Sequence, residues 1–306
     1  MLYSPRFDNA TGRSASAMPD PYRPRTAPKK HIMSGTTPTI LALSSTVAAG
    51  HVGLSAIVPT LHLIGRTAIA LPTITLSNHP GFGHVSGIQT PPETLLTMID
   101  ALEQNGWLAN IDTILTGYLP SAAHVNVAST AINRVRALNP DARYICDPVL
   151  GDDPKGLYID ATAANAIRDD LIPLADIALP NRFELSWLTG TPVASPHDAI
   201  TAARKLPQTR QCPRIIAKSI PSGTDQICNI DITRNTATSI TIQTLEGVPN
   251  GTGDMLSGLI AAGWSLPRAT AALTSVINAS LGENHLAIVP AADQWRNATA
   301  LPAQPL

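Results

Sequence analysis

Residues 250–264 read NGTGDMLSGLIAAGW, a glycine turn that stands directly before an apolar helix. Gly251 and Gly253 can adopt backbone conformations that are closed to other residues, so successive amides can point at one spot. A helix N-terminus adds partial positive charge there, which favours a bound phosphate. Two interpretations remain open for Asp254: it caps the helix, or it is a general base at the mouth of an anion cradle.

The chain around this turn alternates between strand-like and helix-like segments. Short apolar runs predict strands at 39–45, 67–75, 111–117, 142–149, 175–180 and 214–219. Segments with helical spacing follow at 52–65, 92–106, 121–140, 161–173, 181–190 and 197–207, and two more helices are expected at 253–264 and 267–286. Residues 224–233 and 236–245 alternate as a β-hairpin does. This order predicts an α/β fold with a mostly parallel sheet covered on both faces.

Polar residues cluster where the predicted strands end. They are Ser44, Ser45, Asn78, His79, Gly117, Tyr118, Asp147, Asn181, Glu184, Lys218 and Ser219. Parallel sheets bind ligands beyond the carboxyl ends of their strands. The placement therefore predicts a binding site at that edge of the sheet.

Composition excludes several classes of protein. Of 306 residues, 44% are hydrophobic and 14% charged, and the net charge of −1 leaves no basic footprint for nucleic acid or an anionic membrane. No apolar run reaches the length of a membrane span. Neither a GxxxxGK[ST] loop nor a GxGxxG after the first strand occurs. The cysteines Cys146, Cys212 and Cys228 are expected to be reduced thiols, and the protein is expected to be cytoplasmic.

Residues 1–37 differ from the rest of the chain. They are rich in Pro, Ser, Ala and Arg and show no apolar period. This composition predicts a disordered N-terminal extension, with residues 38–306 forming one folded domain.

Seven stretches, in order, resemble the pyridoxal kinases of the ribokinase superfamily. They are ILALSSTVAAGHVGLSA, LPTITLSNHPGFGHVSG, LTGYLPSA, YICDPVLGD, ADIALPNRFELSWLTG, IIAKS and NGTGDMLSGLI. The resemblance implies a ribokinase-like three-layer α/β/α sandwich, usually a homodimer. It also implies transfer of the γ-phosphoryl group of ATP to the hydroxymethyl group of a vitamin B6 vitamer, with Mg²⁺ and a monovalent cation as expected cofactors.

The resemblance also implies roles for single residues. Asp254 would deprotonate the substrate hydroxyl, and the amides of Gly251, Thr252 and Gly253 would form the anion hole. Around the nucleotide and its metal it places Asp147, Asp152, the flap residue Tyr158, Asn181, Lys218 and Ser219. Glu184 and Asp147 would help to hold hydrated Mg²⁺. Around the vitamer it places Ser45, Gly50, His79 and Tyr118.

The vitamer side departs from the family pattern. Ala49 stands where a tyrosine is common, Pro80 where threonine is usual, and His84 and Val85 replace a basic residue and a tryptophan. Two alternatives therefore stay open: a related kinase for hydroxymethylpyrimidine or another hydroxymethyl substrate, and a non-catalytic pyridoxal phosphate binder. Other histidines, such as His62, His124 and His285, show no metal-ligand spacing and are expected to be structural or exposed.

Overall fold

The computed structural model describes residues 38–206 and 214–306, which belong to one compact unit. The predicted extension at 1–37, the last residue of the helix expected at 197–207, and Cys212 lie outside these described residues. Cys146 and Cys228 are both free and buried. No helix of the described ranges is long and apolar enough to cross a lipid bilayer.

A ten-stranded sheet runs through the unit in the order β12-β11-β10-β9-β8-β5-β4-β1-β2-β3. The strands β2, β1, β4, β5, β8 and β9 pair in parallel, and the outer pairs are antiparallel. The strand bounds are β1 Thr39–Val47, β2 Thr67–Leu76, β3 Gly87–Gln89, β4 Ile111–Thr116, β5 Arg143–Cys146, β8 Ile177–Ala178, β9 Arg214–Gly223, β10 Gln226–Ile232, β11 Ala237–Gln243 and β12 Gln304–Pro305. The predicted, mostly parallel sheet is confirmed.

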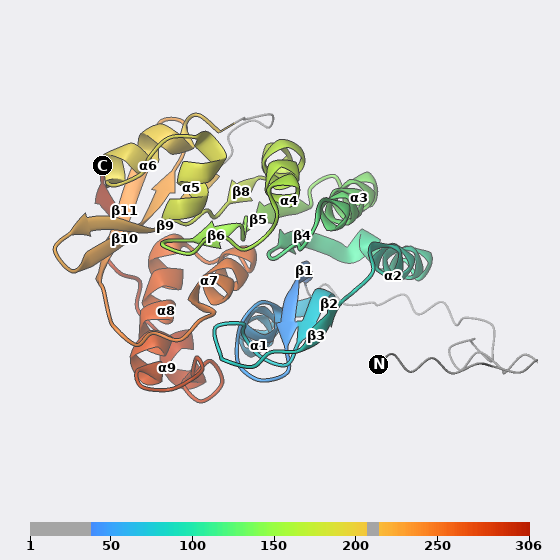
Figure 1. Ribbon diagram of the computed structural model, residues 1–306, viewed down its shortest axis with the longest axis horizontal. Coiled ribbons are helices and arrows are strands. Elements are labelled where there is room, and N and C mark those ends of the chain that lie inside the picture. Colours follow the sequence, from blue (N-terminus) through green and yellow to red (C-terminus); the bar gives the residue numbers. More distant parts are fainter. Residues whose placement is uncertain (1–37, 207–213) are drawn as a thin grey trace, which may run out of the picture. The chain divides into compact units, whose positions relative to one another are not determined.

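Helices cover both faces of this sheet, and in Figure 1 α3–α6 lie above the strands while α1, α7, α8 and α9 lie below them. The helix bounds are α1 Leu54–Leu63, α2 Pro92–Gln104, α3 Ala122–Leu138, α4 Ala161–Ala166, α5 Arg182–Thr189, α6 Pro196–Ala203, α7 Thr252–Ala261, α8 Leu266–Ser280 and α9 Ala292–Arg296. Short 3₁₀ or π turns occupy Leu108–Asn110, Ile167–Leu171 and Ile172–Leu174.

The strand β1 shows why the unit has two cores. Its side chains alternate between the faces, so Leu41 and Leu43 pack in the cluster under α2–α6. Ile40 and Ala42 pack in the cluster under α1, α7, α8 and α9. All four are fully buried. The continuous apolar run in the sequence is therefore the signature of a strand covered on both sides.

Several boundaries differ from the sequence-based expectation. The helix predicted at 52–65 begins two residues later, at Leu54, and Pro59 lies in its interior. The helix expected at 161–173 is α helix only as far as Ala166; it then widens into a π turn at Ile167–Leu171 and tightens into a 3₁₀ turn at Ile172–Leu174. The small hairpin of β6 (Gly151–Asp152) and β7 (Gly156–Leu157) had no strand signal, because each arm is only two residues long. The predicted hairpin of β10 and β11 is confirmed.

Candidate active site

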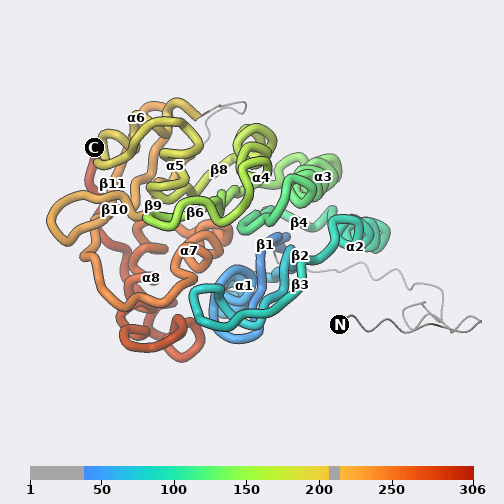
Figure 2. Tube along the Cα trace, in the orientation of Figure 1, coloured from blue at the N-terminus to red at the C-terminus, as the bar shows by residue number. Residues whose placement is uncertain are grey.

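The glycine turn before α7 is fixed by close packing against the loop that leads into α1. Gly251 has φ 103°, and a Cβ placed on it would lie 1.8 Å from the carbonyl oxygen of His51. No other residue fits there. The helices α1 and α7, which are far apart in the sequence, consequently lie side by side (Figure 2). The first amides of α7 have no acceptor within the helix, so they remain free to bind an anion.

Asp254 lies in the first turn of α7 and is half-buried. Burial raises the pKa of its carboxyl to about 6, and the negative charge of Asp147 adds to this rise. A hydrogen bond from the backbone of Gly53 and the positive charge of Lys218 act in the opposite direction. A carboxyl with a pKa near neutrality can accept a proton from a hydroxyl more readily than an ordinary aspartate.

Asp147 and Lys218 form a buried ion pair beside this turn. Lys218 Nζ lies 2.6 Å from Asp147 Oδ1, and Ser257 of α7 donates a hydrogen bond to Oδ2 of the same carboxylate. A Cβ on Gly253 would lie 3.5 Å from Lys218 Nζ, so the ammonium group borders the glycine turn. Burial lowers the pKa of Lys218, but the carboxylates of Asp147 and Glu184 raise it further, so the net pKa is raised and the side chain is charged.

Asn181 and Glu184 form a capping box at the start of α5. The side chain of Asn181 accepts a hydrogen bond from the Glu184 amide at 2.9 Å, and Glu184 Oε2 accepts one from the Asn181 amide at 2.7 Å. Glu184 Oε1 also accepts a hydrogen bond from the Leu150 amide, which ties α5 to the loop that leads into β6. The sequence predicts a helix over 181–190; in the structure Asn181 is the capping residue before α5 and not part of the helix.

Glu184 is buried, and this burial raises the pKa of its carboxyl to about 8. Lys218 lowers that pKa and Asp147 raises it. Asp147, Glu184 and Asp254 thus surround one ammonium group, which leaves an excess of acidic groups. Within the described ranges, no three His, Cys, Asp or Glu side chains are grouped to ligate a metal directly. The donor set therefore fits a hydrated Mg²⁺, which keeps several waters and uses few carboxylates.

Two of the three remaining predicted nucleotide contacts belong to the hairpin of β6 and β7 and the residue that follows it. Asp152 and Tyr158 are both exposed. Burial of its ring raises the pKa of Tyr158 to about 12, and the charges of Asp152 and Glu184 contribute. Tyr158 therefore lies within electrostatic reach of Asp152 and of the buried Glu184. Ser219 is exposed on β9, where its amide donates to Asn229 Oδ1.

The two serines that end β1 have different surroundings. Ser44 is buried, and its Oγ accepts a hydrogen bond from the Tyr118 amide at 3.0 Å, which joins the ends of β1 and β4. Ser45 is half-buried, and a Cβ on Gly53 would lie 2.4 Å from Ser45 Oγ. Ser45 is thus packed against the loop that also bonds to Asp254. Tyr118 is half-buried, and burial raises the pKa of its phenol.

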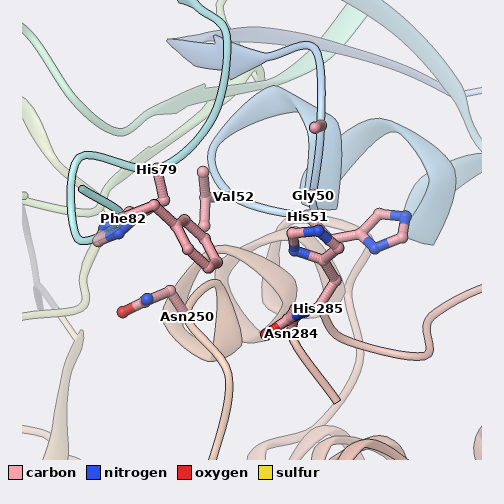
Figure 3. A pocket seen from close by; sticks show the side chains of 9 residues that line it. Gly50, His51, Val52, His79, Phe82, Asn250, Asn284 and His285 are labelled. Atoms are coloured by element: carbon pink, nitrogen blue, oxygen red, sulfur yellow. The ribbon is translucent and has the colours of Figure 1, made fainter. Parts of the chain in front are cut away.

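A hollow of about 210 Å³ lies next to the glycine turn (Figure 3). Its lining comes from the loop between β1 and α1, the loop after β2, the residue before Gly251 and a segment after α8. The lining residues are Ala49, Gly50, His51, Val52, His79, Phe82, Asn250, Asn284 and His285. Of the predicted vitamer contacts, the hollow brings together Gly50 and His79. Ser45 and Tyr118 are not in its wall.

Sequence reasoning missed three of these wall residues as parts of a site. Asn250 adjoins the glycine turn and could have been found from that position. Asn284 and His285 follow α8 and carry no motif, so only the fold brings them to the hollow. His62 and His124 agree with expectation. His62 is exposed, and the buried ring of His124 is hydrogen-bonded to Ser121 Oγ and Thr90 O.

An anion cradle with a carboxylate of raised pKa, at the edge of a mostly parallel sheet, defines a phosphotransferase of the α/β class. A family model described as phosphomethylpyrimidine kinase matches residues 48–281. The pyridoxal kinase PdxY of Corynebacterium diphtheriae is 35% identical over 224 residues, which cover 72% of this chain and 78% of the relative. That of Leifsonia xyli is 35% identical over 73% of this chain and 80% of the relative. The chain belongs to the pyridoxal kinase family of ribokinase-like enzymes.

Solved structures agree with this assignment. Pyridoxal kinase from Leishmania donovani in complex with ADP and pyridoxamine superposes with a TM-score of 0.82 at 27% identity, covering 88% of this chain and 99% of that one. Pyridoxal kinase from Entamoeba histolytica gives a TM-score of 0.80 at 27% identity, covering 88% and 100%. The predicted ribokinase-like fold is confirmed.

Proposed function

We propose that this enzyme transfers the γ-phosphoryl group of ATP to the 5′-hydroxymethyl group of pyridoxal, or a related vitamin B6 vitamer, to give the 5′-phosphate. The observation that carries the proposal is the position of Asp254. It stands one turn into α7, three residues after Gly251, with its pKa raised to about 6. The general base Asp254 and the amides of the glycine turn therefore lie next to each other at the start of α7.

In this mechanism Asp254 accepts the proton of the substrate hydroxyl as the new oxygen–phosphorus bond forms. The amides of Gly251, Thr252 and Gly253 hold the equatorial oxygens of the migrating phosphoryl group. Lys218 borders the same turn and supplies a fixed positive charge. Its own position is held by the hydrogen bond to Asp147. The reaction needs little covalent chemistry from the protein, so positioning and electrostatics supply most of the acceleration.

Mg²⁺ would neutralise charge on the phosphates of the nucleotide. We assign its outer contacts to Glu184 and Asp147, through water, because both oxygens of each carboxylate already accept hydrogen bonds from protein groups. Asp152, Tyr158, Asn181 and Ser219 would border the nucleotide. A monovalent cation, a homodimeric assembly and a cytoplasmic location also belong to this proposal.

The preference for a vitamin B6 vitamer is supported by the relatives of this chain rather than by the residues between β1 and α1. Two relatives that are 35% identical to this chain are pyridoxal kinases, and a Leishmania donovani pyridoxal kinase structure is a complex with ADP and pyridoxamine.

A second candidate is phosphorylation of hydroxymethylpyrimidine. The description of the matching family model, phosphomethylpyrimidine kinase, favours it. Both substrates present a hydroxymethyl group on a six-membered heterocycle. The glycine turn and its base would act identically on either, so the difference must lie in the ring pocket.

Assaying ATP-dependent phosphorylation of pyridoxal, pyridoxine, pyridoxamine and hydroxymethylpyrimidine by the full chain tests the proposal. We expect the largest kcat/KM for a B6 vitamer. A larger value for hydroxymethylpyrimidine would select the second candidate. Tight vitamer binding without phosphoryl transfer would identify a non-catalytic binder instead.

A further inference from the structure

His285 lies at the wall of the hollow, on a segment that no recognised motif includes (Figure 3). Its ring meets that of Phe82 edge to face, with 5.9 Å between centroids and 63° between planes. Phe82 is 39% exposed, so part of its ring is open beside the hollow that it lines. These two rings therefore form an aromatic corner that still has free surface.

Gly50 shows that His285 belongs to the substrate side of the site. A Cβ on Gly50 would lie 2.8 Å from His285 Nδ1, so the imidazole fills the space that a side chain in the first motif would need. Gly50 also has φ 105°, a conformation that favours glycine. Asn250, on another wall of the hollow, directly precedes the glycine turn. The aromatic corner is thus adjacent to the anion cradle.

The hollow also contains an unpaired polar atom. Nδ1 of His51 is buried and has no hydrogen-bond partner among the residues that the structure describes. Buried polar atoms in native proteins are nearly always paired with protein groups or with water. The lining combines the aromatic ring of Phe82 with polar side chains such as those of His51, Asn250 and Asn284.

We propose that His285, backed by Phe82, is a specificity-determining residue whose ring forms the wall against which the substrate heterocycle packs. The inference rests on the proposed function and names the contact that selects a ring. Ala49 and Val85 supply no aromatic side chain at the two positions where the family commonly has a tyrosine and a tryptophan. The segment after α8 replaces that surface, and stacking on an aromatic partner favours a flat π-system over an aliphatic alcohol.

The test compares His285→Leu with His285→Phe in the full chain. Steady-state KM for pyridoxine and for ATP is measured, together with direct calorimetric binding of pyridoxine, which has no aldehyde to react with lysines. We expect His285→Leu to raise the pyridoxine KM and dissociation constant about three- to tenfold. The ATP KM should stay within about twofold. His285→Phe, which keeps an aromatic face, should restore most of the loss.

The control is His62→Leu, the same substitution at an exposed site on α1. If His285→Leu fails to fold, Phe82→Leu on the exposed loop gives the same readout, because it removes the other half of the corner. Unchanged pyridoxine affinity in either variant would overturn the inference, as would equal losses in the Leu and Phe variants of His285. Binding of pyridoxine to the wild type without its phosphorylation would overturn the proposed function alone, and no vitamer binding at all would overturn both.

Discussion

Lys218 and Asp147 form an ion pair in the interior, with Nζ 2.6 Å from Oδ1 and both side chains more than nine-tenths buried. Lys218 comes from β9 and Asp147 follows β5, so the pair joins strands that are separated in the sheet by β8. A buried charge that loses its partner is costly, since the remaining charge cannot be solvated. The ion pair is therefore part of the scaffold as well as of the site.

Lys218→Met should lower the free energy of unfolding by about 3–5 kcal/mol, because Asp147 is left buried and unpaired. The double variant Lys218→Met/Asp147→Asn should recover part of this loss. Urea unfolding of the three proteins measures it. Lys205→Met, at an exposed position, is the control and should stay within about 0.5 kcal/mol of the wild type. A Lys218→Met protein as stable as the wild type would contradict the ion-pair argument.

Asp254→Asn should reduce kcat by about 10²–10⁴-fold, since the amide cannot accept the hydroxyl proton. The amides of the glycine turn remain, so the dissociation constant for ATP should change little. Single-turnover kinetics and nucleotide binding separate the two effects. Asp141→Asn, at an exposed site beyond α3, is the matched control. Turnover of Asp254→Asn close to that of the wild type would remove Asp254 as the base.

The raised pKa of Asp254 predicts a pH profile. A general base works only when deprotonated, so kcat/KM for the vitamer should be constant above the pKa of about 6 and should fall below it. One essential proton gives a tenfold loss per pH unit on the acid side, as a bell-shaped profile shows. Circular dichroism at each pH separates this loss from unfolding. A flat profile from about pH 5 to 7 would argue against a base with this pKa.

Much of the scaffold could be predicted from the sequence because alternating strands and helices restrict the topology. Asp147 and Lys218 each follow an apolar run, which placed them at one edge of the sheet. The partnership of Asp147 with Ser257 could not be predicted, because Ser257 reaches it from α7, 110 residues away in the chain. The three-residue spacing of Asn181 and Glu184 could have been interpreted as a capping box, which would have placed the start of the helix after Asn181.

The wall of the hollow next to the glycine turn could not be predicted from the sequence. That wall is assembled from segments whose contact depends on tertiary packing, and His285 follows α8 without any local pattern. The histidine had been expected to be structural or exposed. Only the clash that a Cβ on Gly50 would have with His285 explains why that glycine and this histidine belong together.

Ser44 and Ser45 should respond differently to alanine. Ser44→Ala removes the acceptor of the Tyr118 amide in a buried place, so the free energy of unfolding should fall by about 1–3 kcal/mol. Ser45→Ala should mainly raise the KM for the vitamer, with a smaller effect on stability. Thermal unfolding and vitamer kinetics of both variants check this, and each serine is the control for its neighbour. An unchanged KM for every vitamer in Ser45→Ala would exclude its contact with the ring.

Gly251→Ala and Gly106→Ala separate backbone strain from steric clash. Both glycines have positive φ, 103° and 75°, so alanine costs about 1–2 kcal/mol of strain at either site. Only Gly251 has a neighbour in the way, the His51 carbonyl oxygen at 1.8 Å from the new Cβ, whereas Gly106 has nothing within 4 Å. Gly251→Ala must therefore push α1 away from the turn, so we expect loss of phosphoryl transfer and a melting temperature well below that of Gly106→Ala. Gly106→Ala should keep its kcat. Equal melting temperatures and equal activity in the two variants would show that the contact between His51 and the glycine turn does not hold the anion cradle in place.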